Sequence, residues 1–369
     1  MGLRSASNAP TLAVAALGLV DMNLKELAGH LELSTTTVSR ALNGYPEVNE
    51  ATRERVRRAA EALNYRPRHH ARQLATGRAF ALGHVVTRSR HALIAPLFAD
   101  LMAGAGEAAD ALGYDTHLRI VDDDSEEDHY REIAASRRVD ALVLHGPLAV
   151  DPRIALLEEL GLPFIVHGRS DVGIDYAWLD VDNIGALRRA TSLLLDLGHA
   201  RIGLVNGPET LHFAHARRVG FEQAHRAHGL RTESSLMSAG PLAEHLGHGA
   251  TVRLLDAADP PTALVCSGLL PAWGALRALL SRGLVPGVDL SVVAYDDGVP
   301  WLANLPDASG EAPLTTVRGS IHEAGRRLVD HLVRAIETPG GPRAAETLPV
   351  ELVLGRSTGP PPSRRATAP

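Results

Sequence analysis

The chain has 369 residues, of which 45% are apolar and 22% charged, and its formal net charge is −6. This length predicts two or three domains with a real core, and the negative charge excludes a general attraction to nucleic acid. The single cysteine, Cys266, excludes a disulfide framework and a cysteine zinc site, and it favours the reducing cytoplasm. No apolar run approaches the ~20 residues of a membrane span.

The first 21 residues contain an apolar stretch at 12–20 that follows Arg4 and faintly resembles a secretory signal peptide. No convincing cleavage site follows it, and Met22 leads directly into a helical pattern. We therefore expect residues 1–21 to be a disordered arm or an over-extended start, with Met22 as the true initiator.

The charges are unevenly distributed. Residues 22–80 carry ten Lys and Arg against six Asp and Glu, so the rest of the chain has a net charge of −10. A small basic module joined to a larger acidic one is expected when only one end of a protein meets phosphates.

The basic module begins with two predicted helices separated by a three-residue turn. Apolar residues recur at helical spacing over 24–30, behind the capping residue Asn23. Ser34 caps a second helix, 35–42, and Asn43-Gly44 ends it. A third helix, from Asn49 or Glu50 to residue 63, completes a small core. This is a helix-turn-helix, whose second helix enters the DNA major groove.

The outer face of the second helix carries hydroxyls and one guanidinium, from Thr35, Thr36, Ser39 and Arg40. Such groups contact phosphates or base edges, and an arginine can bond guanine at two positions. A solvated helix surface has the same composition, so the face alone leaves both interpretations open.

Residues 66–80 form a basic connector, and from 81 onward short apolar strands alternate with helices, typical of parallel α/β architecture. The predicted strands are 82–86, 141–144, 164–166, 202–205, 263–266 and 291–295. The predicted helices include 98–112, 184–197, 216–227 and 272–282. So many βα units exceed one sheet and predict two doubly wound lobes, with ligands outside the carboxyl ends of the strands.

The module at 22–65 resembles the LacI/GalR family of bacterial transcriptional repressors. The resemblance rests on NLKELA at 23–28, VSRALNG at 38–44, VNEATRERV at 48–56 and LNYRP at 63–67, and runs without a gap. It implies that bases are contacted by Thr35, Thr36 and Arg40, and the DNA backbone mostly by Ser34, Thr37, Ser39 and Asn43.

The resemblance continues into the connector, where residues 67–75 match the family's hinge helix. It implies that Leu74, with Arg72 nearby, enters a central minor-groove step and kinks the DNA. Inserting an apolar side chain costs the free energy of unstacking two bases, and the bent DNA offsets this cost by contacting more protein surface. A dimer is required, because each subunit supplies one of the two inserted leucines. An ordinary linker contact is the alternative for Leu74.

A looser match covers most of the remainder, through PLF at 96–98, VDN at 181–183, LGHARI at 197–202, RRVGF at 217–221, YDD at 295–297, PLTTV at 313–317 and ELVLGRST at 351–358. It implies a two-lobed domain similar to periplasmic sugar-binding proteins over 81–358. The first lobe is expected at 81–167 and 317–338, the second at 168–314 and 343–358. Residues 359–369, rich in Pro, Ser and Ala, are expected to be disordered.

The resemblance also implies the effector site. Arg217 falls on the family's ligand arginine and Asp296 on its ligand aspartate, while Phe98 supplies a lining face and Arg169 a further donor. A structural role remains the alternative for both arginines, and helix capping for Asp296. Asp182 is expected to organise a helix start rather than to touch ligand.

One departure from the family concerns the pair Asn-Asp that commonly follows the strand at 263–266. Here the chain reads Ser267-Gly268-Leu269, so both polar groups are missing and the effector cannot be inherited from well-known members. Residues 36–48 and the triplet His167-Gly168-Arg169 are similar to the α-glucoside-regulator branch, which implies an α-glucoside effector.

Together these features predict a dimeric, cytoplasmic, nucleoid-associated repressor that uses no cofactor or metal and leaves its operator when a sugar-like effector binds. Corepression, with the opposite sign, stays open. A solute-binding protein would need an export signal and no helix-turn-helix. An enzyme is unsupported, because no metal-ligand spacing, nucleophile elbow or phosphate-binding glycine loop is present. The tail after 358 is too rich in proline to form the leucine-heptad helix of the family's tetramers.

Overall fold

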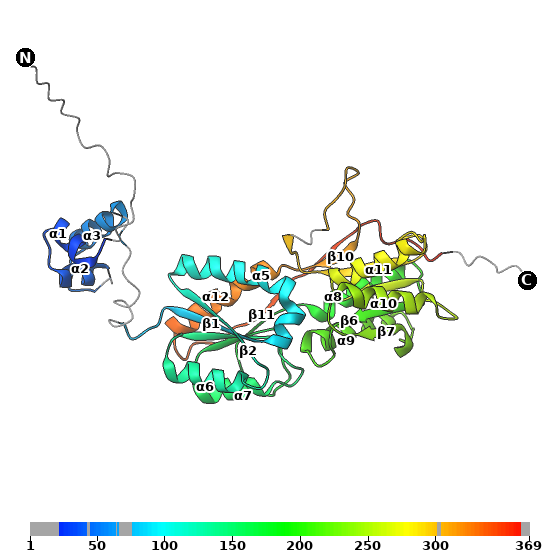
Figure 1. Cartoon of the computed structure of the whole chain (residues 1–369), viewed down its shortest axis with the longest axis horizontal. Helices are drawn as coiled ribbons and strands as arrows, with labels where there is room; N and C mark the ends of the chain where they lie inside the picture. The colour runs from blue at the N-terminus through cyan, green and yellow to red at the C-terminus, as the bar shows by residue number, and fades with distance from the viewer. Residues whose placement is uncertain (1–21, 43–44, 64, 66–75, 301–303, 363–369) are drawn as a thin grey trace, which may run out of the picture. The chain divides into compact units, whose positions relative to one another are not determined.

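A computed structural model describes residues 22–42, 45–63, 65, 76–300 and 304–362 (Figure 1). The chain divides into two compact units, residues 1–78 and 79–369. No helix in the described part of the chain is long and apolar enough to cross a membrane.

The described residues of the first unit form the helices α1 (Leu24–His30), α2 (Thr35–Leu42) and α3 (Glu50–Ala62). Each begins at a polar cap, because the free N–H groups of a first turn need an acceptor. Asn23 and Asn49 accept from Glu26 N and Thr52 N, and Ser34 Oγ accepts from Thr37 N at 3.0 Å. The helices pack around the fully buried side chains of Leu27, Val38 and Val56.

The first lobe of the second unit is built on a parallel sheet in the order β11-β5-β4-β3-β1-β2. Its strands are β1 (Ala81–Thr87), β2 (Asp115–Val121), β3 (Ala141–His145), β4 (Phe164–His167), β5 (Trp178–Val181) and β11 (Ala345–Leu348). Helices α5 (Arg88–Leu112) and α12 (Ile321–Glu337) cover one face, and α6 (Glu126–Ser136) and α7 (Pro152–Leu160) the other.

The second lobe repeats this plan with the sheet β12-β10-β9-β8-β6-β7, in which only the pairing of β12 with β10 is antiparallel among the described strands. Its strands are β6 (Ile202–Asn206), β7 (Met237–Ala239), β8 (Ala263–Cys266), β9 (Ser291–Asp296), β10 (Thr315–Arg318) and β12 (Glu351–Val353). One face carries α8 (Asn183–Asp196) and α9 (His212–Ala227), and the other α10 (Glu244–Leu255) and α11 (Leu269–Ser281). A short 3-10 helix, η1 (Ser234–Leu236), precedes β7.

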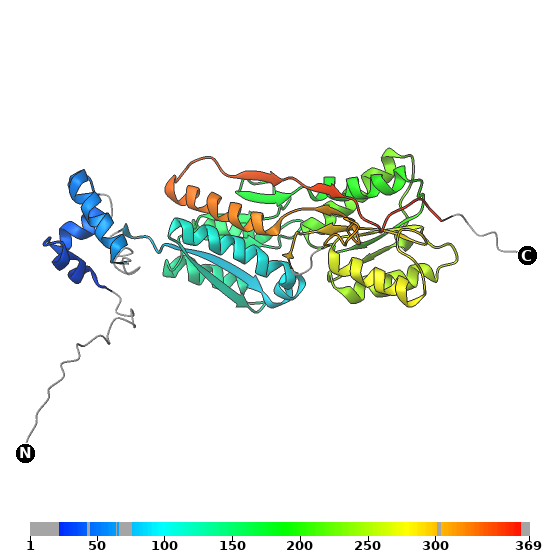
Figure 2. The ribbon, with the colours of Figure 1, turned by 90° about the horizontal axis from the view of Figure 1, so that it is seen from above.

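The lobe boundaries differ from those predicted. The first lobe extends through β5 and regains β11, because both strands hydrogen-bond into its sheet, whereas β10 belongs wholly to the second lobe. The chain therefore crosses between lobes after β5, after β10 and between β11 and β12, and Figure 2 shows the last crossing in red. The predicted crossing at Gly168 is only a turn, at φ +111°.

The predicted connector 66–80 and the predicted tail 359–369 also need correction, because residues 79–80 and residue 359 belong to the folded second unit. The Asp140 carboxylate accepts from Ala79 N at 2.8 Å and from Phe80 N at 2.6 Å, which fixes both residues in the second unit. Phe80 is held in the left-handed region at φ 50°. In the tail, Gly359 O lies 2.9 Å from His199 Nε2, so this residue is anchored. Residues 1–21, 66–75 and 363–369 lie outside the described part.

Candidate functional site

The outer face of α2 presents the side chains predicted to contact DNA. The predicted base-contacting residues are all exposed: Thr35, Thr36 and Arg40. The predicted backbone-contacting residues on this helix and its cap are exposed or half-buried: Ser34, Thr37 and Ser39. Three further predicted DNA contacts lie outside the described residues: Asn43, Arg72 and Leu74.

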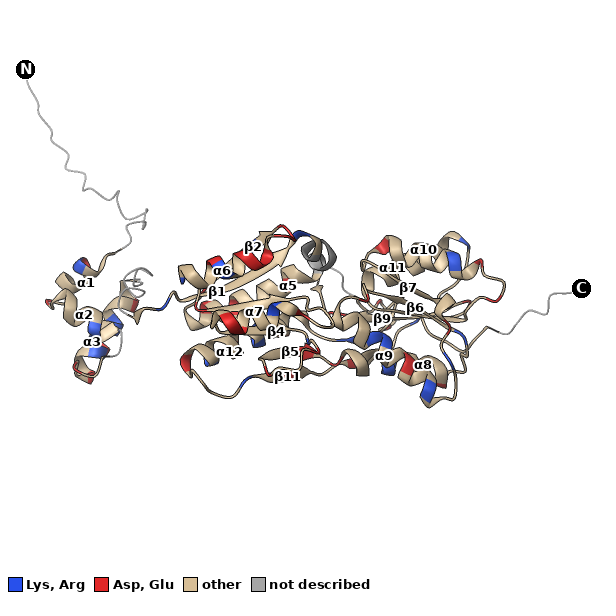
Figure 3. Ribbon diagram, turned by 90° about the horizontal axis from the view of Figure 1, so that it is seen from below, with Lys and Arg blue, Asp and Glu red and all other residues tan. Residues whose placement is uncertain are grey.

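Helix α3 carries residues of both charge signs, coloured blue and red in Figure 3, and their side chains are exposed or half-buried. Glu54 Oε1 accepts from Arg57 Nη2 and from Arg58 Nε, each at 2.8 Å. These arginines are therefore neutralised locally, whereas α2 carries no acidic residue in its first turn and presents Arg40 in its last. Helix α2 therefore presents the exposed guanidinium of Arg40 beside its hydroxyl groups.

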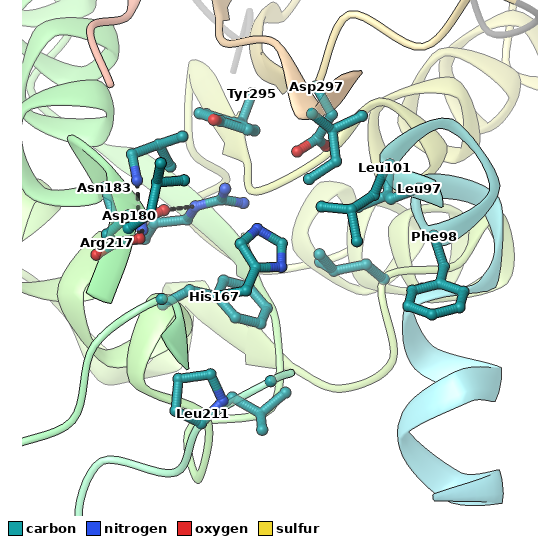
Figure 4. Close-up of a pocket in the computed structure, with 18 of the residues that line it drawn as sticks. Leu97, Phe98, Leu101, His167, Asp180, Asn183, Leu211, Arg217, Tyr295 and Asp297 are labelled. Atoms are coloured by element: carbon teal, nitrogen blue, oxygen red, sulfur yellow. Dashed lines mark hydrogen bonds between the residues drawn. The ribbon is translucent and has the colours of Figure 1, made fainter. Parts of the chain in front are cut away.

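A cleft lies between the two lobes at the carboxyl ends of their strands (Figure 4). The first lobe contributes an apolar wall that includes Leu97, Phe98, Leu101, Pro147 and Leu179, and the second contributes Leu211, Phe213, Leu242 and Tyr295. Five polar side chains also line it: His167, Asp180, Asn183, Arg217 and Asp297. A mostly apolar cavity with a few convergent polar groups is the usual form of a small-molecule site.

Arg217 is the buried cation of the cleft, only 5% exposed. Its Nε donates to Asn183 Oδ1 at 2.8 Å and its Nη1 donates to the carbonyl of Ser267. The guanidinium carbon lies 3.7 Å from the centroid of the Tyr295 ring. Both hydrogen-bond acceptors are neutral, so they orient the guanidinium without cancelling its charge.

Asn183 is placed by the start of α8. Asp182 caps that helix by accepting from Gly185 N at 2.8 Å, which is the organising role predicted for it. Asn183 Nδ2 donates to Asp180 Oδ1 at 2.9 Å, so a chain of hydrogen bonds runs from Asp180 to Arg217. Burial raises the pKa of Asp180 to about 6.

Asp297, not the predicted Asp296, faces the cleft. Asp296 turns away, accepting from Gly298 N at 2.8 Å and lying 3.9 Å from Arg318 Nε. Successive side chains at the end of a strand point to opposite sides, which separates the two carboxyls. Burial raises the pKa of Asp297 to about 6, against the opposing effect of Arg217.

Of the other two predicted effector residues, Phe98 lines the cleft and Arg169 does not. Phe98 is buried and lines the cleft from α5. Arg169 is exposed and is not one of the lining residues, because its guanidinium stacks 4.1 Å above the Trp178 ring. The structure therefore brings together Phe98 and Arg217 and leaves Arg169 outside.

Three histidines, His84, His145 and His167, lie on the adjacent strands β1, β3 and β4 of the first lobe. His84 Nδ1 lies 2.9 Å from His145 Nε2, and the His145 ring packs edge-on against both His167 and Phe98. Burial lowers the pKa of His84 and of His167 to about 4, and that of His145 well below its usual value. All three are neutral at pH 7. In the described part of the chain, no cluster of three His, Cys, Asp or Glu side chains is arranged to hold a metal.

The position of the missing Asn-Asp pair is occupied by Ser267, whose Oγ donates to Asn206 Oδ1 at 2.6 Å. The serine side chain is thus engaged inside the second lobe, while its carbonyl supports Arg217. This substitution leaves the cleft with polar groups mainly around Arg217 and Asp297.

The sequence prediction missed four polar lining residues: His167, Asp180, Asn183 and Asp297. Each lies at or just beyond the carboxyl end of a strand, or at the first turn of the following helix. In parallel α/β sheets, ligands bind at the carboxyl ends of the strands. Polar residues at the predicted strand ends could therefore have been proposed as lining residues. Strand β5, which carries Asp180, was not predicted, and this hid that residue.

Two family models match the chain. Residues 23–68 match the family described as bacterial regulatory proteins, lacI family. Residues 80–350 match periplasmic binding proteins and sugar binding domain of LacI family.

The chain is also similar to individual proteins. It is 42% identical over 349 residues to the HTH-type transcriptional regulator AglR of Rhizobium meliloti (strain 1021), covering 93% of this chain and 96% of AglR. A transcriptional regulator CelR–cellobiose complex superposes with TM-score 0.67 at 29% identity, over 91% of this chain and 99% of CelR. The lac repressor dimer bound to operator and the anti-inducer ONPF gives TM-score 0.73 at 25% identity, over 92% and 100%. This chain therefore belongs to the LacI family and is a helix-turn-helix, DNA-binding transcriptional regulator.

Proposed function

We propose that the chain is a dimeric repressor whose operator complex is released when a carbohydrate binds in the cleft between the lobes. The observation that carries this proposal is Arg217, a buried cation oriented by neutral acceptors and facing the same cavity as Asp297. A forked donor and a carboxyl acceptor together match the adjacent hydroxyls of a sugar ring.

The apolar lining supports a carbohydrate over a smaller polar ion. Phe98, Leu101 and Leu179 from the first lobe, with Phe213 from the second, offer surfaces for the C–H faces of a sugar ring. CelR, which the chain resembles over most of its length, was solved with cellobiose.

An α-glucoside is the effector we propose to test first. The similarity of residues 36–48 and of His167-Gly168-Arg169 to the α-glucoside-regulator branch favours it, and AglR is a relative at 42% identity. Ser267 changes the hydrogen-bonding set of the cleft, so the sugars that well-known members bind are a weaker guide.

The mechanism we infer is a two-state switch acting in the cytoplasm. Without effector, the dimer holds both copies of α2 in successive major grooves, with Arg72 and Leu74 of each connector at the minor groove between them. The effector binds the closed cleft more tightly than the open one, and this difference in affinity shifts the dimer away from its DNA-binding state.

The switch is tested by a gel shift on the operator beside the chain's gene, with maltose, trehalose and cellobiose, alongside thermal-shift measurement of binding. We expect one α-linked sugar both to raise the melting temperature and to release DNA. R217A should keep operator binding and lose the response to that sugar. Specific DNA binding that is unchanged by every sugar the protein demonstrably binds would contradict induction, and tighter binding would assign corepression.

Contact between α2 and bases is tested by R40A against R58A. Both arginines are exposed, but Arg58 already pairs with Glu54 on α3. We expect R40A to lose about 1–3 kcal/mol of operator affinity and to relax the preference for one base pair. R58A should bind within about twofold of the unmodified protein in the same fluorescence-anisotropy titration. Equal losses for the two variants would remove α2 as the reading helix.

A further inference from the structure

Two loops, one from each lobe, meet across one end of the cleft. Residues 147–149 follow β3 in the first lobe, and residues 210–212 lead into α9 in the second. Leu148 and Leu211 pair across the gap as an antiparallel β-bridge. These two segments are called the latch below.

Backbone hydrogen bonds flank this pair on both sides. Ala149 N donates to Thr210 O at 3.1 Å, and His212 N donates to Pro147 O at 3.0 Å. The lobes are therefore joined here by main-chain bonds that do not depend on side-chain identity. This is the arrangement of a non-hydrogen-bonded antiparallel pair, in which the facing Cα atoms lie closest.

The first-lobe half of the latch is fixed within its own lobe. Leu148 N donates to Asp151 Oδ2 at 2.9 Å. The carbonyl of Ala149 accepts from Asp171 N at 2.7 Å and from Ser170 Oγ at 3.2 Å. The loop is held in an extended shape that presents the Ala149 N–H and the Pro147 carbonyl to the other lobe.

The second-lobe half is fixed by the start of α9. Leu211 is the residue before that helix, extended at φ −86° and ψ 135°, and its N–H donates to Pro208 O at 3.0 Å. His212 is the first helical residue, so its N–H has no partner within the helix. Its bond to Pro147 satisfies a donor that would otherwise need water.

The latch lies away from the three covalent crossings. In the first sheet the crossing strands β11 and β5 occupy one edge, and β3 lies two places further in; in the second, β12 and β10 occupy one edge, and β6 lies three places further in. Pro147 and Leu211 both line the cleft, and Figure 4 shows Leu211 at its border. The cleft is thus bounded by hinges on one side and by the latch on the other.

We propose that the latch is the gate of the cleft: residues 147–149 and 210–212 must part before an effector enters or leaves, and they re-pair to hold the closed state. This inference rests on the proposed effector site. Its test needs no carbohydrate, so a failed latch and a failed effector proposal give different results.

The test measures access of a thiol reagent to the cleft of the full-length protein. Leu179 is fully buried where the cleft wall meets the core of the first lobe, so the thiol of an L179C variant reacts with iodoacetamide when the lobes part or when the first lobe unfolds. Both latch substitutions at residue 212 lie in the second lobe, so they leave first-lobe unfolding as a constant background. Cys266 is fully buried in β8, and burial raises the pKa of its thiol, so its labelling reports unfolding of the second lobe. Mass spectrometry of the peptides separates the two rates.

Two substitutions at His212 isolate the backbone bond. In the L179C background, H212A removes the imidazole but keeps the N–H, whereas H212P also removes the N–H. Proline is well tolerated at the first position of a helix and after an extended residue, so α9 should persist. We expect H212P to label the engineered thiol about fivefold faster than H212A, the factor given by one backbone hydrogen bond of typical net strength. Cys266 labelling should stay unchanged.

Equal rates for H212P and H212A, or an equal acceleration at Cys266, would overturn the proposal. A second experiment cross-links the two halves of the latch with a disulfide. L148C with L211C in the same background should form a disulfide, because facing residues of a non-hydrogen-bonded antiparallel pair have suitable Cα separation. The oxidised protein should label the L179C thiol at least tenfold more slowly than the reduced protein. Labelling at the same rate in both states would also overturn it.

Discussion

The contrast between Asp296 and Asp297 shows how one residue step decides which carboxyl lines the cleft. Both carboxyls are largely withdrawn from water, and burial raises the pKa of each. Asp296 is engaged by Gly298 N, whereas Asp297 lines the cleft with Arg217. The side that a side chain faces therefore matters more here than its proximity in sequence.

We expect D297N to weaken carbohydrate binding by tenfold or more, because an amide replaces a strong acceptor of sugar hydroxyls. D296N should leave that affinity within about twofold, and calorimetric titration of both variants measures the difference. A larger loss in D296N than in D297N would contradict the assignment.

His84 gives the protein a defined sensitivity to acid. The unfolded histidine takes up a proton below pH 6.5, whereas the folded residue remains neutral until about pH 4. Its contribution to stability is therefore present above pH 6.5 and is lost as the pH falls through this window. The raised pKa values of Asp180 and Asp297 act in the opposite direction over much of the same range.

The variant H84N places a non-titrating amide where Nδ1 of the imidazole lies. Between pH 7 and pH 5, we expect the unfolding free energy of the unmodified protein to fall by about 2 kcal/mol more than that of H84N. Urea denaturation at the two pH values measures this, and the comparison cancels the carboxyl contributions. Parallel curves would show that His84 protonates as readily in the folded protein.

At the scale of elements, the first lobe depends on the close crossing of α5 and α12. A Cβ added at Gly325 would lie 2.1 Å from Leu101 O, and one at Gly104 would lie 2.0 Å from His322 O. These helices therefore touch through their backbones. Leu101 also lines the cleft and Ile321 begins α12 beside it, so the crossing sets the shape of the apolar wall.

G325A should lower the melting temperature sharply and cost about 3 kcal/mol or more, because overpacking at a backbone contact forces the helices apart. G106A, on the partner helix α5, is the control, since nothing lies within 4 Å of its new Cβ. It should be neutral or stabilise the protein by up to about 1 kcal/mol. Similar losses in both variants would indicate that these two helices tolerate no added methyl group, whether or not it meets the backbone contact.

Elements with strong local signals could be predicted from the sequence, and those defined by their neighbours could not. The bounds of α1 and α2 followed from caps and apolar spacing, and the central strands β1, β3, β4, β6, β8 and β9 from short apolar runs. Strand β2 was missed because it lies at a sheet edge with most of its residues exposed. The edge strands β11 and β12 are only four and three residues long, so only their pairing identifies them.

The candidate site was predicted in part for the same reason. Phe98 and Arg217 line the cleft, and their contact with an effector stays a prediction. Asp297 was missed because residue spacing does not reveal which of two adjacent carboxyls faces inward. Arg169 was misplaced because its partner, the Trp178 ring, lies on an unpredicted strand.

At the scale of the whole molecule, the two proposed binding activities rest on different electrostatics. The region 22–80 has a surplus of positive charge on a chain that is otherwise acidic. Its contacts with phosphates release counterions and therefore depend on salt, whereas Asp180, Asn183 and Arg217 of the cleft are buried and poorly screened.

Raising salt from 50 to 200 mM should weaken operator binding by about a thousandfold or more, while carbohydrate affinity changes by less than about twofold. Anisotropy titrations for DNA and calorimetry for sugar, on one preparation, provide the comparison. A similar salt dependence for both ligands would mean that the effector is itself charged.

The two hydrogen bonds from Ala79 N and Phe80 N to the Asp140 carboxylate have a mechanical consequence. One carboxylate holds two consecutive N–H groups and keeps Phe80 at φ 50°, so rotational freedom of the main chain ends at residue 78. A tilt of β1 would therefore carry Ala79 and Phe80 with it, because Asp140 holds both of their N–H groups. Movement of the first lobe thus passes to residue 79 through a single aspartate.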